Sequence, residues 1–280
     1  MLDSIKQNMF LFRGTDKLNP QNEFTSDDIR FDDYSFPASL DFFSSDTKER
    51  FENNLTAQPP DWRYRSQKVE YIFNKHGFRT KEFEDIDFSN SVFLFGCSET
   101  MGTGLDETET ISYQLENKLG VPVINLARNG TSMHYSFVNN LILKKICKKP
   151  IAVINHWTAL NRLTYYGKHT STNLLPRHSF FFKKYYSLLM SQLGFSIEDI
   201  TSHHDFQARL ISENCKLLWD NTQYIETSWD KTTAEVLECH KTNQIDHARD
   251  VIFSENRLIG HSGVNTANSI AEFYASKIDL

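Results

Sequence analysis

Residues 91–105, SVFLFGCSETMGTGL, decide the fold class of this chain. The run SVFLFG at 91–96 is apolar, ends in glycine, and has the length of a strand buried on both faces of a parallel sheet. Ser98 follows two residues after that glycine, where the strand gives way to a turn. Gly102 and Gly104 permit tight backbone geometry close by. These features predict an α/β fold that begins with this strand.

Strand and helix patterns alternate downstream of this stretch. Amphipathic helices are predicted at 110–120 and 132–149, and further buried strands at 121–127 and 150–158. The order β-α-β-α-β with short links is typical of a parallel sheet covered by helices. Beyond this core, helices are expected at 180–200, 205–221 and 265–278, and a strand at 222–229.

Residues 1–90 differ from the rest of the chain. They are rich in Asp, Ser, Asn, Pro and Phe and show little periodicity. We predict an irregular N-terminal extension that packs its aromatic side chains on a neighbouring surface. That surface belongs either to the α/β domain at 91–280 or to a partner. In the second case the extension would build a homo-oligomer or a larger assembly.

Composition limits the classes of function. The chain has 280 residues, a net charge of −6 and 13% aromatic residues, which suits one large folded domain with an extension. A nucleic-acid binder would normally carry a basic patch, and the mild acidity argues against one. No stretch is long and apolar enough to cross a bilayer, and the first residues are too polar for a secretory signal. The four widely spaced cysteines predict reduced thiols and no metal site.

Three further motifs place polar residues near Ser98. Gly130 lies in VINLARNGTS (123–132), Asn155 in VINHWTALNR (153–162), and His261 in a Gly-His-Ser-Gly turn before the last helix. Ligands bind at the carboxyl edge of open parallel sheets, where these residues are expected to meet. A serine with backbone N–H groups beside it can attack an ester carbonyl, an amide can donate to the oxyanion, and histidine can act as base.

Each of these residues also has a structural interpretation. Ser98 suits a helix N-cap, and Gly130 suits an ordinary turn between strand and helix. Asn155 and its polar neighbours can simply mark the end of a strand, and His261 is one of 10 histidines. The residues alone therefore leave the catalytic and structural interpretations open.

The four motifs, in this order, resemble the four blocks of the SGNH/GDSL hydrolase family. Gly96-Cys97-Ser98 looks like the family's Gly-Asp-Ser turn, and Gly130 looks like its oxyanion glycine. The resemblance covers roughly residues 91–160 and 245–280 and is greatest to phage and marine bacterial members. It implies a three-layer α/β/α fold with a flavodoxin-like parallel sheet. It also implies an ester substrate, either a small molecule or a glycan, with no metal and no organic cofactor.

The last two family blocks match this chain less closely. Asn155 is the nearest candidate for the asparagine of the third block, and His261 resembles the triad base. The family acid precedes that histidine by three residues, and here the position holds Leu258. Asp250, in a stretch like the one that leads into the histidine, is the candidate acid. It can act only if the inserted residues 251–260 fold it back beside His261.

Three functions follow from these observations. In the first, an esterase or deacetylase acts on an ester such as an acylated carbohydrate. Ser98 attacks, His261 and Asp250 complete the triad, and Gly130 and Asn155 help to hold the oxyanion. In the second, an inactive SGNH-like module binds or builds a larger complex, and in the third the acyl group passes to an acceptor other than water. The location expected is the cytoplasm or a virion.

Overall fold

The computed structural model describes residues 37–158, 163–166, 171–174, 197–228, 246–254 and 257–280. Its centre is a four-stranded parallel sheet with the order β4-β3-β5-β8. The predicted α/β fold class is thus confirmed. The strands are β3 (Val92–Phe95), β4 (Val123–Asn125), β5 (Ala152–Trp157) and β8 (Gln223–Ser228).

The strand order creates a switch point at the carboxyl edge of the sheet. The chain leaves β3 and crosses to β4 on one side, and later crosses to β5 on the other side of β3. In open α/β sheets, ligands bind outside the carboxyl ends of strands where the order reverses in this way. The loop that follows β3 is therefore the expected place for a site.

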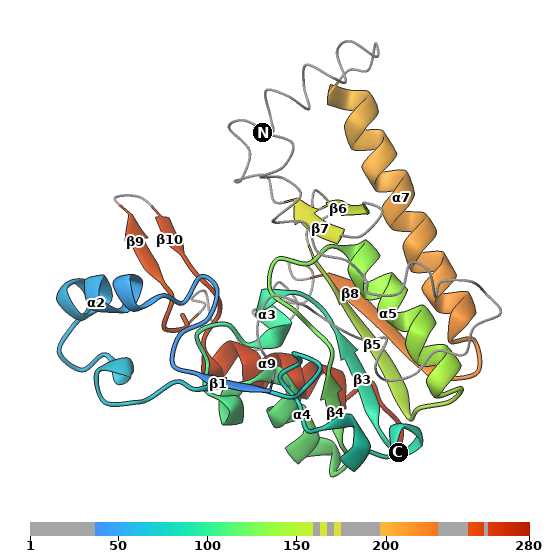
Figure 1. Cartoon of the computed structure of the whole chain (residues 1–280), viewed down its shortest axis with the longest axis horizontal. Coiled ribbons are helices and arrows are strands. Elements are labelled where there is room, and N and C mark those ends of the chain that lie inside the picture. Colours follow the sequence, from blue (N-terminus) through green and yellow to red (C-terminus); the bar gives the residue numbers. More distant parts are fainter. Residues whose placement is uncertain (1–36, 159–162, 167–170, 175–196, 229–245, 255–256) are drawn as a thin grey trace.

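Helices cover both faces of the sheet (Figure 1). The helices α4 (Ile111–Leu119) and α9 (Val264–Ala275) share a buried cluster with one face. The other face packs against α5 (Met133–Ile146), which in turn lies against α7 (Ile197–Leu218). This arrangement has the parallel sheet covered by helices that the sequence pattern predicted, and the three α/β/α layers that the family resemblance implied.

Alternation along the strands decides which side chain meets which layer. Val92 and Leu94 belong to the cluster beneath α4 and α9, whereas Phe93 and Phe95 belong to the cluster beneath α5. Successive residues of a strand point to opposite faces, so a fully apolar strand serves both layers. Residues 92–95 are all apolar for this reason.

Predicted helices and strands of the core lie within a few residues of the observed ones. The helix α4 is capped by the Thr110 side chain and stops at Gly120, which adopts a left-handed φ of 70°. One helix, α7, runs through the region at 205–221 where we predicted a helix, and it begins earlier, at Ile197. The remainder of the helix expected at 180–200 lies outside the described residues.

The described part of the N-terminal extension has regular elements of its own. It contains β1 (Ala38–Leu40), α2 (Lys48–Ala57), β2 (Tyr71–Phe73) and three short 3-10 turns. Its aromatic side chains form a buried cluster that includes Met101 and Ala127 of the α/β domain. The described extension therefore packs on its own chain and is more ordered than its composition suggests.

Two small antiparallel hairpins stand apart from the main sheet. One joins β6 (Leu163–Tyr166) to β7 (Ser171–Leu174), and the other joins β9 (Ile252–Ser254) to β10 (Arg257–Ile259). The second hairpin projects from the body beside α2 (Figure 1). In the part of the chain that the structure describes, no helix has the length and apolarity to span a membrane.

Candidate active site

Ser98 lies at the carboxyl end of β3, at the switch point of the sheet. It is the first residue of the short helix α3 (Ser98–Met101), and its exposed fraction is 5%. A side chain at Gly96 would meet the Thr100 hydroxyl at 2.1 Å, so this position needs glycine. Gly102 ends the helix with a φ of 83°, in the left-handed region that favours glycine. The sharp turn after β3 thus depends on two of its glycines.

Arg79 of the N-terminal extension holds the loop that follows Ser98. Its buried guanidinium donates to the carbonyl oxygens of Gly102 at 2.7 Å and Leu105 at 2.8 Å. The same group donates to the carbonyl of Glu70 at 3.0 Å. One side chain therefore satisfies backbone acceptors from both the extension and the nucleophile loop, which fixes the two segments together.

The turn that contains Gly130 lies against the turn of Ser98. The backbone N–H of Arg128 donates to the Gly96 carbonyl at 3.2 Å, and the Thr131 hydroxyl reaches the same oxygen at 3.2 Å. Gly130 itself has a φ of 72°, which favours glycine. The structure thus brings Gly130 to the edge where Ser98 lies, and its oxyanion role stays a prediction.

Asn155 does not reach this edge. It sits within β5 with no exposed surface, and its side chain belongs to the α5 layer. There it accepts a hydrogen bond from Asn140 at 3.0 Å and donates to the Tyr224 hydroxyl at 3.1 Å. An amide held within the core cannot meet a substrate oxyanion, so this placement argues against the role that we predicted for Asn155.

Asp250 and His261 lie side by side. Asp250 Oδ2 is 2.7 Å from the ring nitrogen Nδ1 of His261, and Asp250 Oδ1 accepts the His261 backbone N–H at 3.1 Å. The side chains are 1% and 13% exposed. Two contacts from one carboxylate orient both the ring and the backbone of the histidine. The second ring nitrogen is left facing away from the acid.

The hairpin between these two residues explains the contact. Its register pairs Ile252 with Ile259, and at its base the backbone N–H of Ala248 donates to the His261 carbonyl at 2.9 Å, so the turn at 249–250 holds Asp250 beside His261. A side chain at Gly260 would meet Val251 Cα at 2.7 Å, so close strand approach at this base needs glycine. The described residues of the insertion, 251–254 and 257–260, thus fold outward and leave acid and histidine adjacent.

Glu99 connects the histidine to the nucleophile turn. Its Oε2 accepts hydrogen bonds from the backbone N–H of Ser262 at 3.1 Å and from the Ser262 hydroxyl at 2.9 Å. Because Glu99 follows Ser98 and Ser262 follows His261, the two candidate catalytic residues lie on neighbouring backbones. No hydrogen bond joins the Ser98 hydroxyl to His261 among the described residues.

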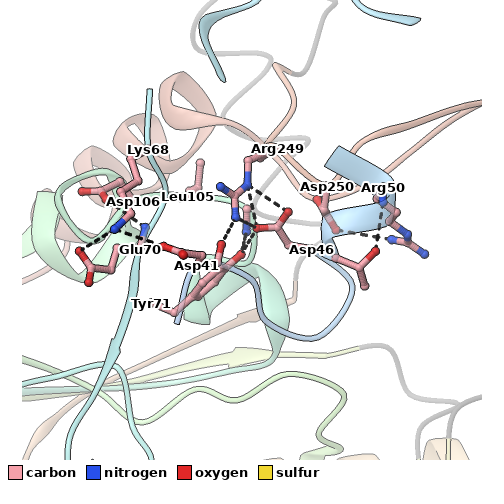
Figure 2. Close-up of polar contacts among 12 residues, drawn as sticks. Asp41, Asp46, Arg50, Lys68, Glu70, Tyr71, Leu105, Asp106, Arg249 and Asp250 are labelled. Carbon is pink, nitrogen blue, oxygen red and sulfur yellow. Dashed lines mark hydrogen bonds and ion pairs between the residues drawn. The ribbon is translucent and has the colours of Figure 1, made fainter. Parts of the chain in front are cut away.

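The N-terminal extension also surrounds the acid. The Ser45 hydroxyl donates to Asp250 Oδ2 at 2.8 Å, and the Arg50 guanidinium lies 4.0 Å from the same oxygen. Beside them, Arg249 forms an ion pair of 2.6 Å with Asp46, a contact that Figure 2 shows together with Asp250 and Arg50. The carboxylate of Asp250 is thus contacted by Ser45 and Arg50 of the N-terminal extension and by His261 of the C-terminal segment.

The electrostatics favour a charged histidine beside a charged acid. Burial by itself lowers the pKa of His261, but the hydrogen bond to Asp250 and the nearby carboxylate of Glu99 outweigh burial and raise it to about 9. Burial raises the pKa of Asp250, but the hydrogen bonds from His261 outweigh burial and hold it below its ordinary value. At neutral pH the pair is therefore an imidazolium and a carboxylate.

Two parts of this site escaped the sequence interpretation. Ser45 contacts Asp250 across 205 residues of sequence, and no local pattern could signal that contact. Glu99 did carry a signal, since an acidic residue next to a buried strand and turn is costly unless it is hydrogen-bonded. Among the described residues, no group of three or more His, Cys, Asp or Glu is placed to hold a metal ion.

Comparisons with known proteins add little to this geometry. No protein-family model matches the chain, and no curated protein matches it. Among solved structures, it is similar to a chain assigned to the G-D-S-L lipolytic family from Desulfitobacterium hafniense, with 11% sequence identity and a TM-score of 0.33. The match covers 68% of this chain and 99% of that chain. A likeness at that TM-score does not establish the family of this chain.

Proposed function

We propose that this chain is a serine hydrolase of the SGNH/GDSL type that cleaves carboxylic esters. Ser98 is the nucleophile, His261 the general base and Asp250 the acid that orients the base. The observation that carries the proposal is the contact of 2.7 Å between Asp250 Oδ2 and His261 Nδ1. It fixes the ring so that its other nitrogen is the one available to a serine hydroxyl.

The reaction needs no group beyond these residues and water. The Ser98 hydroxyl oxygen bonds to the ester carbonyl carbon while its proton passes to His261. The tetrahedral intermediate collapses as the protonated histidine gives that proton to the leaving alcohol, which leaves an acyl-serine. Water then repeats the sequence, releasing the acid and restoring Ser98. Asp250 stays ionised and stabilises the imidazolium in both halves.

The oxyanion of each intermediate needs donors that are already in place. Backbone N–H groups of Ser98 and Gly130 are the candidates, because their two turns are joined through the Gly96 carbonyl. Asn155 is left out because its amide is used inside the core. The substrate proposed is an acylated small molecule or carbohydrate, and acyl transfer would differ only in the acceptor that replaces water.

A second candidate is an SGNH-like protein that binds without catalysis. It is favoured by the raised pKa of His261, about 9, because a histidine that stays protonated at neutral pH cannot accept the Ser98 proton. Hydrolysis is therefore expected to be strong only in alkaline solution. A test at neutral pH alone would not separate the two functions.

A fluorophosphonate probe separates them when it is used at pH 7 and pH 9.5. We expect Ser98 to be labelled, faster at the higher pH, and the Ser98→Ala variant to lose both labelling and hydrolysis of p-nitrophenyl acetate. The matched control is Ser66→Ala, an exposed serine of the extension, which should behave like the parent protein. Hydrolysis that survives Ser98→Ala, or a folded protein unlabelled at both pH values, would contradict the proposal.

A further inference from the structure

Glu99 is a second carboxylate beside the candidate histidine. It accepts two hydrogen bonds from Ser262, one from the backbone N–H at 3.1 Å and one from the hydroxyl at 2.9 Å. Glu99 follows the candidate nucleophile in sequence, and Ser262 follows the candidate base. The side chain of Glu99 therefore joins α3 to the segment that carries His261.

The surroundings of Glu99 affect its charge in two directions. Burial raises its pKa, while the positive charge of His261 and the two donors of Ser262 act against that rise. Hydrogen bonds donated to a carboxylate favour its ionised form. The oxygen Oε2 accepts both donors, but burial outweighs them and the pKa of Glu99 lies above its ordinary value.

The groups that act on His261 come from three segments. Asp250 contacts the ring directly, Glu99 and the Cys97 thiol act from the nucleophile turn, and Ser45 and Arg50 act through Asp250. Glu99 is the carboxyl group among them whose hydrogen bonds go to Ser262 and to neither the ring nor the triad acid. Its effect on the histidine is therefore electrostatic, combined with the tether to Ser262.

We propose that Glu99 is a positioning residue with two effects, tethering the segment of His261 to the nucleophile turn and setting, by its charge, the pH at which His261 can accept a proton. The inference rests on the proposed function, in which His261 is the base. It differs from a purely structural role, because a tether alone requires an acceptor atom but no charge.

Two substitutions separate the charge from the tether. Glu99→Gln keeps a carbonyl oxygen that can accept from Ser262 and removes the negative charge. Glu99→Ala removes both. Glu213→Gln makes the same chemical change on α7, at an exposed side chain paired with Lys216, and serves as the matched control.

The first readout is an NMR titration of the histidine ring, which needs no enzymatic activity. In the full chain labelled with ¹⁵N-histidine, the His261 signal is identified by its loss in His261→Asn. We expect its pKa to fall by about one pH unit in Glu99→Gln, since a nearby opposite charge is worth that much or more. Glu213→Gln should leave it unchanged. An unchanged His261 pKa in a folded Glu99→Gln protein would overturn the inference.

The second readout is the pH dependence of ester hydrolysis. Glu99→Gln should move the rising limb of the kcat/KM profile toward lower pH by the same amount, so that activity at pH 7 rises several-fold. Glu99→Ala should lose kcat at every pH. If Ser98 proves inert while the His261 titration still responds to Glu99→Gln, the proposed function fails and the coupling stands. If hydrolysis proceeds but its pH profile ignores Glu99→Gln, the inference fails alone.

Discussion

The carboxylate of Asp46 and the guanidinium of Arg249 form a buried ion pair of 2.6 Å although 203 residues separate them. The Tyr71 hydroxyl donates to Asp46 at 2.6 Å and accepts the Gly104 N–H at 2.7 Å. Arg249 directly precedes Asp250, so this network connects the N-terminal extension, the nucleophile loop and the candidate acid (Figure 2). The extension is thereby part of the site's framework.

Breaking this ion pair should destabilise the whole chain. Asp46→Ala leaves the Arg249 charge buried without its partner, and we expect a loss of about 3–5 kcal/mol in the free energy of unfolding. Urea denaturation followed by circular dichroism measures it. Asp41→Ala, which removes a side chain that is 65% exposed, should change stability by less than about 0.5 kcal/mol. Equal losses in the free energy of unfolding would show that the buried ion pair contributes no more to stability than the exposed Asp41 side chain.

Gly104 should tolerate no side chain, because the backbone segment that leads to the acid, residues 248–250, approaches it closely. A Cβ there would lie 2.8 Å from Ala248 Cβ and 2.9 Å from the Arg249 nitrogen, whereas a Cβ at Gly120 would meet nothing within 4 Å. Both glycines have a left-handed φ, so the backbone strain that an alanine introduces is similar at the two positions, and they differ in steric contact. We expect Gly104→Ala to lower the melting temperature clearly more than Gly120→Ala. A smaller effect at Gly104 would mean that the two segments separate easily.

Asp250→Asn should remove most of the hydrolytic activity without unfolding the protein. An amide at this position can hold His261 in the wrong tautomer, and the loss in kcat for such a change in a serine triad is about 10⁴-fold. Steady-state hydrolysis of p-nitrophenyl acetate measures it. The exposed Asp61→Asn is the control and should leave kcat unchanged. A folded Asp250→Asn enzyme that keeps full activity would remove Asp250 from the triad.

Hydrolysis should increase with pH up to about 9. The pKa of His261 is raised to about 9, so the neutral ring needed for base catalysis forms only as the pH approaches that value. From pH 7 to pH 9 we expect kcat/KM to rise about 50-fold. The raised pKa also contributes stability below the ordinary pKa of histidine, and this stability is lost as the pH rises through 9. A flat kcat/KM between pH 6 and 9 would contradict both expectations.

Ser45→Ala should move the pH profile in the direction opposite to Glu99→Gln. Ser45 donates to the same Asp250 oxygen that faces His261, so its removal leaves more negative charge available to the histidine ring. The pKa of His261 should then rise further, and the rising limb of the kcat/KM profile should shift to higher pH. Ser66→Ala is the control within the extension. A shift toward lower pH would show that Ser45 does not act through Asp250.

Much of the fold could be predicted because its signals are local. The apolar run at 91–96, the helix that ends at Gly120 and the strand at 150–158 each carry their own periodicity and end signals. Asn155 shows the limit of such signals. It lies within β5, inside the predicted strand at 150–158, but only the structure shows that the alternation of this strand turns its amide into the core.

The sequence by itself determined the parallel α/β core and the position of Ser98 after its first strand, since both follow from short-range patterns of apolar residues and glycine. Only the tertiary structure decided that Asp250 lies beside His261, that Glu99 reaches Ser262, and that Ser45 contacts the acid. Those contacts depend on the register of a hairpin and on segments up to 205 residues apart. No local propensity encodes such contacts, because packing of the whole chain selects them.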